Sequence, residues 1–92
     1  MDYPFYDSPD IAVITCCHII EDGEPILYVS HDSDDGMWQC MCGKTHDTNE
    51  ARIVSLLDIF SVDNSIGMLA ELPLGCCAER DSIKSKWKLY RK

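Results

Sequence analysis

Apolar and polar positions in the first half of the chain follow the pattern of β-strands. Residues 11–20 (IAVITCCHII) are almost continuously apolar and rich in β-branched side chains, which is typical of a strand covered on both faces. Residues 25–31 (PILYVSH) and 37–43 (MWQCMCG) continue the pattern, and the turn-forming segments 21–24 (EDGE) and 32–36 (DSDDG) precede them. The pattern predicts a three-stranded antiparallel meander with a hairpin at each turn.

The period changes in the middle of the chain. Residues 44–52 are polar and are expected to form a loop. From Ile53 on, apolar residues recur at helical spacing, and Ser55 and Asp58 form the S-x-x-D pattern of a capping box. A helix is therefore predicted to begin near Ser55.

A second short helix is predicted directly after the first. Either Asp63 or Asn64 can act as its N-cap, and the turn formers Pro73 and Gly75 mark the chain beyond its end. Apolar residues inside these limits would face the sheet, so the two helices are expected on one face.

Strand character returns at the carboxyl end, where residues 76–81 and 86–91 can pair across the intervening turn. The whole pattern predicts an α+β fold: a mostly antiparallel sheet, made of the N-terminal meander and the C-terminal strands, with two short helices on one face. The 92 residues are expected to form a single domain, 1–92, in which residues 1–10 are an N-terminal arm.

Charge divides the chain into an acidic and a basic part. The formal net charge is −8; residues 1–43 contain nine acids and no lysine or arginine, whereas residues 84–92 contain five basic residues and no acid. An acidic surface repels phosphate backbones and attracts basic partners. We therefore expect a basic protein partner and no nucleic acid.

The chain has no pattern typical of export or of membrane insertion. Its first ten residues contain two prolines, three acids and no basic residue, unlike a signal peptide. The longest apolar-rich run, residues 11–20, is about half as long as a bilayer-spanning helix. A cytoplasmic protein without membrane contact is expected, and its six cysteines should be reduced thiols.

The stretch WQCMCGKTH, residues 38–46, raises the question of a zinc site. One residue separates Cys40 from Cys42, whereas structural zinc sites draw ligand pairs from C-x2–4-C knuckles. On a strand, both thiols would share the face of Trp38 and fill the core. Core packing is favoured and no cofactor is expected; a metal, if bound, would take Cys40, Cys42 and His46.

The sequence contains no recognisable catalytic motif. Ser30, His31 and Asp32 are adjacent, but neighbours on a strand point to opposite faces and cannot form a triad. A G-x-S-x-G elbow and a phosphate-binding glycine loop are both absent. A non-enzymatic binding protein is predicted, and the alternative is a small zinc- or thiol-based regulatory module.

Several positions between residues 11 and 83 follow one family pattern: a glycine and a tryptophan beside a third strand that ends in glycine, a hydrophobic helix before D-x-S-I, and a Pro-x-Gly turn before Glu-Arg. These positions are Gly36, Trp38, Gly43, Leu56, Ile59, Asp63, Ser65, Ile66, Leu69, Pro73, Gly75, Glu79 and Arg80. The segment thereby resembles the thirty-third immunity family of bacterial polymorphic toxin systems, formerly a domain of unknown function. Met37 and Lys44 depart from the family pattern.

This resemblance implies a small cytoplasmic protein that binds a cognate toxin and neutralises it by occlusion. Toxin domains that attack nucleic acids carry basic clefts, to which an acidic surface is complementary. The expected contact surface is the hairpin tip together with the preceding turn, with the residues Asp32, Asp34, Asp35, Glu21, Asp22 and Glu24.

Overall fold

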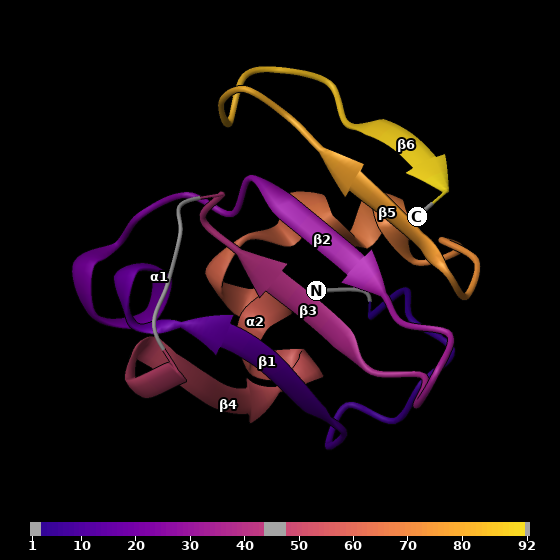
Figure 1. Ribbon diagram of the computed structural model, residues 1–92, viewed down its shortest axis with the longest axis horizontal. Helices are drawn as coiled ribbons and strands as arrows, with labels where there is room; N and C mark the ends of the chain where they lie inside the picture. Colours follow the sequence, from indigo (N-terminus) through magenta and orange to yellow (C-terminus); the bar gives the residue numbers. More distant parts are fainter. Residues whose placement is uncertain (1–2, 44–47, 92) are drawn as a thin grey trace.

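The computed structural model describes residues 3–43 and 48–91, which form a six-stranded sheet with helices packed on one face (Figure 1). The strand order is β4-β1-β3-β2-β5-β6. The strands are β1 (Ala12–Cys16), β2 (Tyr28–His31), β3 (Trp38–Met41), β4 (Ala51–Ser55), β5 (Cys76–Glu79) and β6 (Lys88–Arg91). The helices are α1 (Cys17–Asp22) and α2 (Leu56–Val62) and the 3-10 helices η1 (Thr48–Glu50) and η2 (Asn64–Leu69).

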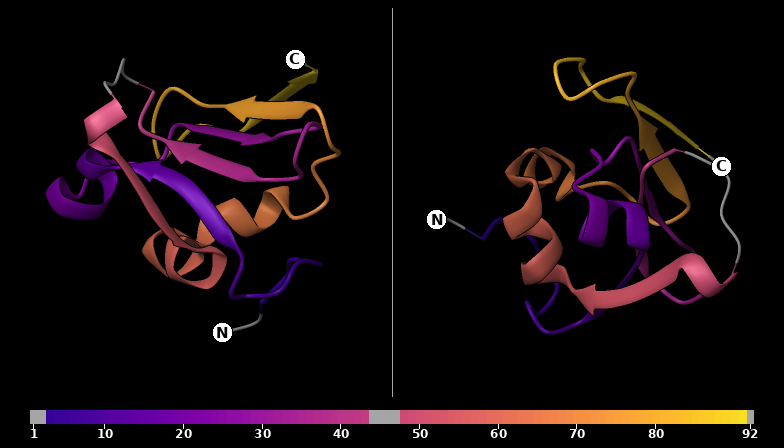
Figure 2. Two further views of the ribbon diagram at one scale, coloured as in Figure 1. Left: turned by 60° about the horizontal axis from the view of Figure 1, so that its bottom comes forward. Right: turned by 90° about the vertical axis from the view of Figure 1, so that its left-hand side faces the viewer.

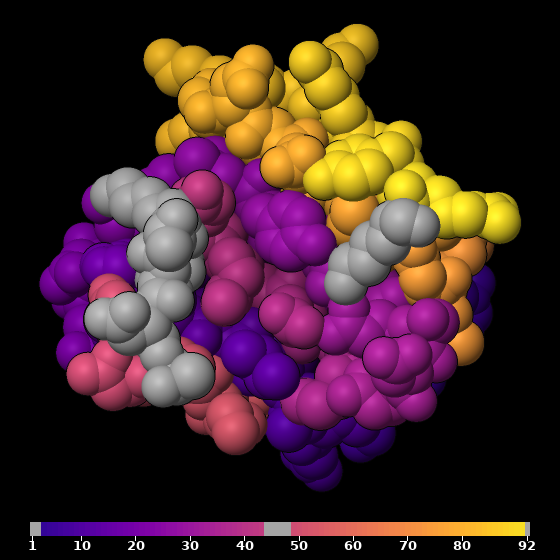
Figure 3. Space-filling model, in the orientation of Figure 1, coloured from indigo at the N-terminus to yellow at the C-terminus, as the bar shows by residue number. Residues whose placement is uncertain are grey.

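The predicted α+β class is confirmed. Strand pairs β1–β4, β2–β3, β2–β5 and β5–β6 are antiparallel, and β1–β3 is parallel. Figure 2 shows α2 and η2 packed together on one side of the sheet, as predicted for the two short helices. On the other side, the strands' own side chains form the surface that Figure 3 displays.

In the described parts of the chain, no helix has the length and apolar character needed to span a bilayer.

The prediction that the first two strands of the meander form a hairpin is wrong. β1 and β2 do not pair, because β3 lies between them. The predicted strand 11–20 ends at Cys16, and the chain continues as α1, which Gly23 ends with a positive φ of 73°. An apolar run of this length fits a buried helix as well as a strand, which explains the error. The second hairpin, between β2 and β3, is confirmed.

The predicted loop 44–52 is also partly wrong. Residues 44–47 lie outside the described residues, but η1 and the edge strand β4 occupy the rest of this range. Ile53 therefore stands on a strand, where its side chain is 72% exposed, rather than on the helix. The helix does begin after Ser55, whose Oγ accepts the N–H of Asp58 at 3.1 Å, as the capping box predicts.

The core lies between the sheet and the helices. Strand side chains such as Val13, Val29 and Trp38 pack against α2 and η2, which contribute Leu56, Ile59, Phe60, Ile66 and Leu69. The predicted N-terminal arm joins this core. Phe5 is 7% exposed and its ring centroid lies 5.3 Å from that of Trp38, whose Nε1 donates to the carboxylate of Asp7 at 2.8 Å.

The second short helix and the C-terminal strands follow the prediction. Asp63 caps η2 by accepting the N–H of Ser65 at 2.9 Å. β5 and β6 pair antiparallel, with Cys77 opposite Tyr90. Lys88 and Arg91 thereby lie on β6, the edge strand of the sheet.

Candidate functional site

The acidic residues predicted to contact a partner form two separate groups. One group lies in the turn between β2 and β3, and the other at the end of α1 (Figure 1). These two segments adjoin opposite ends of β2. The structure therefore does not bring the six acids together into one patch.

In the β2–β3 turn, two of the three acids hold the turn itself. The Asp32 carboxylate accepts from Ser30 Oγ at 3.1 Å and from Gln39 Nε2 at 2.6 Å. Asp35 accepts the backbone N–H of Met37 at 2.9 Å. Asp34 is exposed, and its carboxylate takes part in no hydrogen bond or ion pair found among the described residues. Asp34 is thus the exposed acid of the turn whose carboxylate is not used in holding it.

The second group is partly neutralised. Glu21 accepts from Nε of Arg52 on β4 at 2.7 Å, and both side chains are well exposed. Glu24 is half-buried, whereas Asp22, the last residue of α1, is exposed. Asp22 is therefore the exposed acid of this group that has no ion pair among the described residues.

Of the three predicted zinc ligands, the structure describes Cys40 and Cys42. Cys40 is 1% exposed and lies in the core with Trp38, as predicted for a thiol that fills space. Burial, aided by the charge of Asp63, raises the pKa of its thiol to about 12. Cys42 is buried as well, but its sulfur lies beside His18, and His46 falls outside the described residues.

A different cluster of thiol and imidazole groups forms where β1 and β3 end. Cys16 is the last residue of β1, His18 is the second residue of α1, and Cys42 directly follows β3. β1 and β3 are parallel neighbours, with Ile14 opposite Gln39. Their carboxyl ends therefore reach the same edge of the sheet, and the first turn of α1 places His18 there as well.

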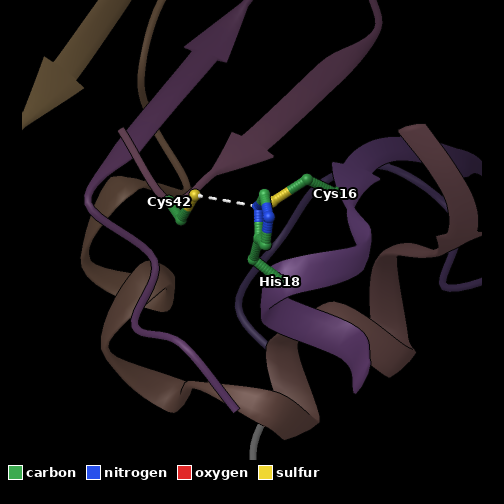
Figure 4. A group of neighbouring side chains, drawn as sticks. All are labelled: Cys16, His18 and Cys42. Carbon is green, nitrogen blue, oxygen red and sulfur yellow. Dashed lines mark hydrogen bonds between the residues drawn. The ribbon is translucent and has the colours of Figure 1, made fainter. Parts of the chain in front are cut away.

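The two sulfurs and the imidazole point toward one another (Figure 4). One ligand atom from each of Cys16, His18 and Cys42 lies within 4.8 Å of the other two. Cys42 Sγ is 3.8 Å from His18 Nδ1, and His18 Nε2 is 3.1 Å from Oε2 of Glu50 at the end of η1. Cys16 and Cys42 are 0% and 3% exposed, so the sulfur side of the cluster is closed to solvent.

The contact with Glu50 favours one tautomer of the neutral His18 imidazole. An ionised carboxylate only accepts hydrogen bonds, so neutral His18 keeps its proton on Nε2 and directs the Nδ1 lone pair toward the sulfurs. Histidine ligands of metals are held in this way by a carboxylate on the second nitrogen. Nucleophilic cysteines in enzymes also have a thiol, an imidazole and an orienting carboxylate in this order. Here, burial of both cysteines blocks substrate access in this conformation.

A second polar cluster surrounds Arg80, which is 6% exposed. Its guanidinium donates to the Ile26 carbonyl at 3.0 Å, to Ser65 Oγ at 2.9 Å and to Asp63 Oδ2 at 2.6 Å. The guanidinium also lies 4.2 Å from the ring centroid of Trp87. Asp63, Ser65 and Arg80 are positions of the family pattern, and the structure unites them in one network that ties η2 to the end of β5.

The Arg80 cluster borders a cleft of about 670 Å³, lined in part by Glu24, Asp63 and Ile83. Burial tends to raise the pKa of Asp63, but hydrogen bonds from Ser65 and Arg80 outweigh it and hold the pKa below its ordinary value. The charges of Asp63 and Arg80 thus already satisfy each other, and this pair is better explained as structure than as a binding site.

Comparison with known proteins adds no assignment. The chain matches none of the protein-family models, curated proteins or solved structures with which it was compared. The resemblance to the immunity family therefore depends on the sequence positions given above.

Proposed function

We propose that this chain is a non-enzymatic cytoplasmic protein that neutralises a cognate bacterial toxin by covering a basic cleft on it. The observation that carries the proposal is the acidic tip of the β2–β3 turn, which is presented on a rigid support. The resemblance to the immunity family points in the same direction. Nucleic acid and membranes are not partners in this proposal.

The turn is held by its own hydrogen bonds. The Asp32 N–H donates to the Met37 carbonyl, and the Gly36 N–H donates to the Asp32 carbonyl, both at 2.9 Å. Together with the side-chain bonds of Asp32 and Asp35, these contacts fix the backbone around Asp34 before any partner arrives. A pre-organised surface loses less conformational entropy on binding, and its negative charge speeds encounter with a basic partner.

The first test is to identify the partner and its effect on cells. The tagged chain is captured from its source cells, and native mass spectrometry of the complex gives the stoichiometry. We expect one basic protein per chain, whose expression alone arrests growth and whose co-expression with this chain restores it. A partner whose expression leaves growth unaffected would contradict the proposal.

The second test locates the contact surface with two matched variants. Asp34→Lys and Asp22→Lys change the charge equally, at opposite ends of β2, and neither removes a side-chain hydrogen bond found among the described residues. Asp34→Lys should slow association several-fold at low salt and weaken its salt dependence, while Asp22→Lys should have a much smaller effect. Equal effects in stopped-flow measurements would reject the hairpin tip as the contact.

A further inference from the structure

We propose that Cys16, His18 and Cys42 bind one zinc ion, through both thiolates and Nδ1 of the imidazole, while Glu50 holds the ring from its other side. This metal centre is independent of the proposed toxin-binding function. Its ligand set differs from the one considered from sequence and shares only Cys42 with it.

The distances fit tetrahedral coordination. Zinc bonds of about 2.3 Å to sulfur and about 2.0 Å to nitrogen place neighbouring ligand atoms roughly 3.5–3.8 Å apart. The Cys42 Sγ to His18 Nδ1 distance is 3.8 Å, and all three ligand atoms lie within 4.8 Å of one another. Small side-chain rotations would bring the third ligand, Cys16 Sγ, to the required separation.

Charge and chemical softness favour the same ion. Two thiolates balance the charge of one divalent cation, and the neutral imidazole adds none, so the centre can be buried without a net charge. Sulfur and imidazole ligands suit zinc, whereas calcium and magnesium require oxygen ligands. Three protein ligands leave a fourth position for water or an exogenous ligand.

Burial alone does not define the site, because cysteine often serves as a small core residue. Cys40 and Cys77 are each 1% exposed, yet neither belongs to a group of potential metal ligands among the described residues. Cys16 and Cys42 differ from them in sharing an imidazole lone pair that a carboxylate directs toward them.

A second possible group, Cys17, His18 and Glu50, competes for the same histidine. All three of its members are half-exposed, and a metal there would use the Glu50 carboxylate that now pairs with His18 Nε2. The buried group instead keeps this pair intact as outer-shell support. Cys17→Ser therefore distinguishes the two groups.

The experiment titrates zinc into the reduced, metal-free full chain and follows binding by calorimetry and native mass spectrometry. We expect one zinc per chain. Cys16→Ser, Cys42→Ser and His18→Ala should each weaken binding by about 100-fold or more, while Cys17→Ser and the control Cys76→Ser should bind as the wild type does. Absence of stoichiometric zinc uptake by the folded wild type would overturn the proposal, as would loss of binding in Cys17→Ser but not in Cys16→Ser.

Cobalt substitution tests the ligands without removing them. The wild type with Co²⁺ should show tetrahedral visible bands and a thiolate-to-metal charge-transfer band of the intensity expected for two sulfurs. Glu50→Gln should lower affinity by about 10–100-fold and leave these bands in place. If circular dichroism shows that Cys42→Ser fails to fold, the cobalt spectrum of the wild type and the affinity of Glu50→Gln test the site in its place. An octahedral spectrum without charge transfer would refute the site.

Discussion

The Arg80 and His18 clusters are both polar groups set into the edge of the core, but they bring together different kinds of atoms. Three guanidinium nitrogens of Arg80 donate to oxygens of Ile26, Ser65 and Asp63. At His18, one nitrogen is paired with Glu50, while the other faces sulfur at 3.8 Å. Thiols are weak hydrogen-bonding groups, so this second contact contributes little to stability.

The difference separates a structural role from a binding role. A charged network whose groups satisfy one another stabilises the elements that it joins and has little left to offer a ligand. A cluster that directs a nitrogen lone pair and two sulfurs to one point can gain free energy from a cation. The two clusters should therefore respond in opposite ways to mutation and to metal.

The largest effect is expected from Arg80→Ala. The substitution removes the Arg80 donors to Asp63 Oδ2 and to the Ile26 carbonyl. Breaking a buried pair in this way costs about 3–5 kcal/mol of unfolding free energy. Urea unfolding measures this loss. The control is Arg52→Ala, which breaks the exposed pair with Glu21 and should cost far less. Similar losses in both variants would show that the Arg80 network is not a stabilising unit.

Zinc should produce the next largest effect, through the other cluster. At a free zinc concentration 100-fold above the dissociation constant, the wild type should gain about 2.7 kcal/mol of unfolding free energy. Arg80→Ala should gain as much, because it leaves the sulfur cluster intact, whereas His18→Ala, with an affinity at least about 100-fold weaker, should gain no more than about 0.4 kcal/mol. Urea unfolding with and without zinc, under reducing conditions, makes the comparison. A zinc gain that disappears in Arg80→Ala would show that the clusters are coupled.

Acid should weaken the Arg80 cluster through Asp63. Its pKa is lowered in the folded state, so its stabilising contribution is complete above the ordinary value of 3.8 and is lost as the pH falls through the lower folded pKa. Asp63→Asn should cost about 1–2 kcal/mol at neutral pH, through loss of a charge-assisted hydrogen bond. Below the ordinary aspartate pKa, the difference between wild type and variant should shrink. A constant difference across that range would exclude Asp63 as a source of acid sensitivity.

Local sequence signals predicted those parts of the fold that depend on neighbouring residues. The Ser55 capping box located the start of α2, and the turn residues 32–36 identified the β2–β3 hairpin. β4 was missed because its partner is distant: Ala12 pairs with Ser55, and no local pattern encodes that register. The apolar run 11–20 could not separate β1 from α1, because both elements bury apolar residues.

The candidate metal site could not be found from spacing alone. The C-x-C pattern drew attention to Cys40, whereas the cluster depends on the parallel pairing of β1 with β3 and on α1 beginning at Cys17. The neighbouring Cys16 and His18 were the available signal, but a strand interpretation of residues 11–20 concealed it. Prediction of this site required the topology first.

The smallest effect is expected at Trp87, whose ring lies against Arg80. Trp87→Leu removes the cation–π contact and should cost about 1 kcal/mol. Trp87→Phe keeps an aromatic face there and also removes a buried indole N–H that has no acceptor among the described residues. These opposing contributions should leave the unfolding free energy of Trp87→Phe within about 0.5 kcal/mol of the wild-type value. If urea unfolding shows Trp87→Phe to be as costly as Trp87→Leu, the indole itself, rather than an aromatic face, stabilises Arg80.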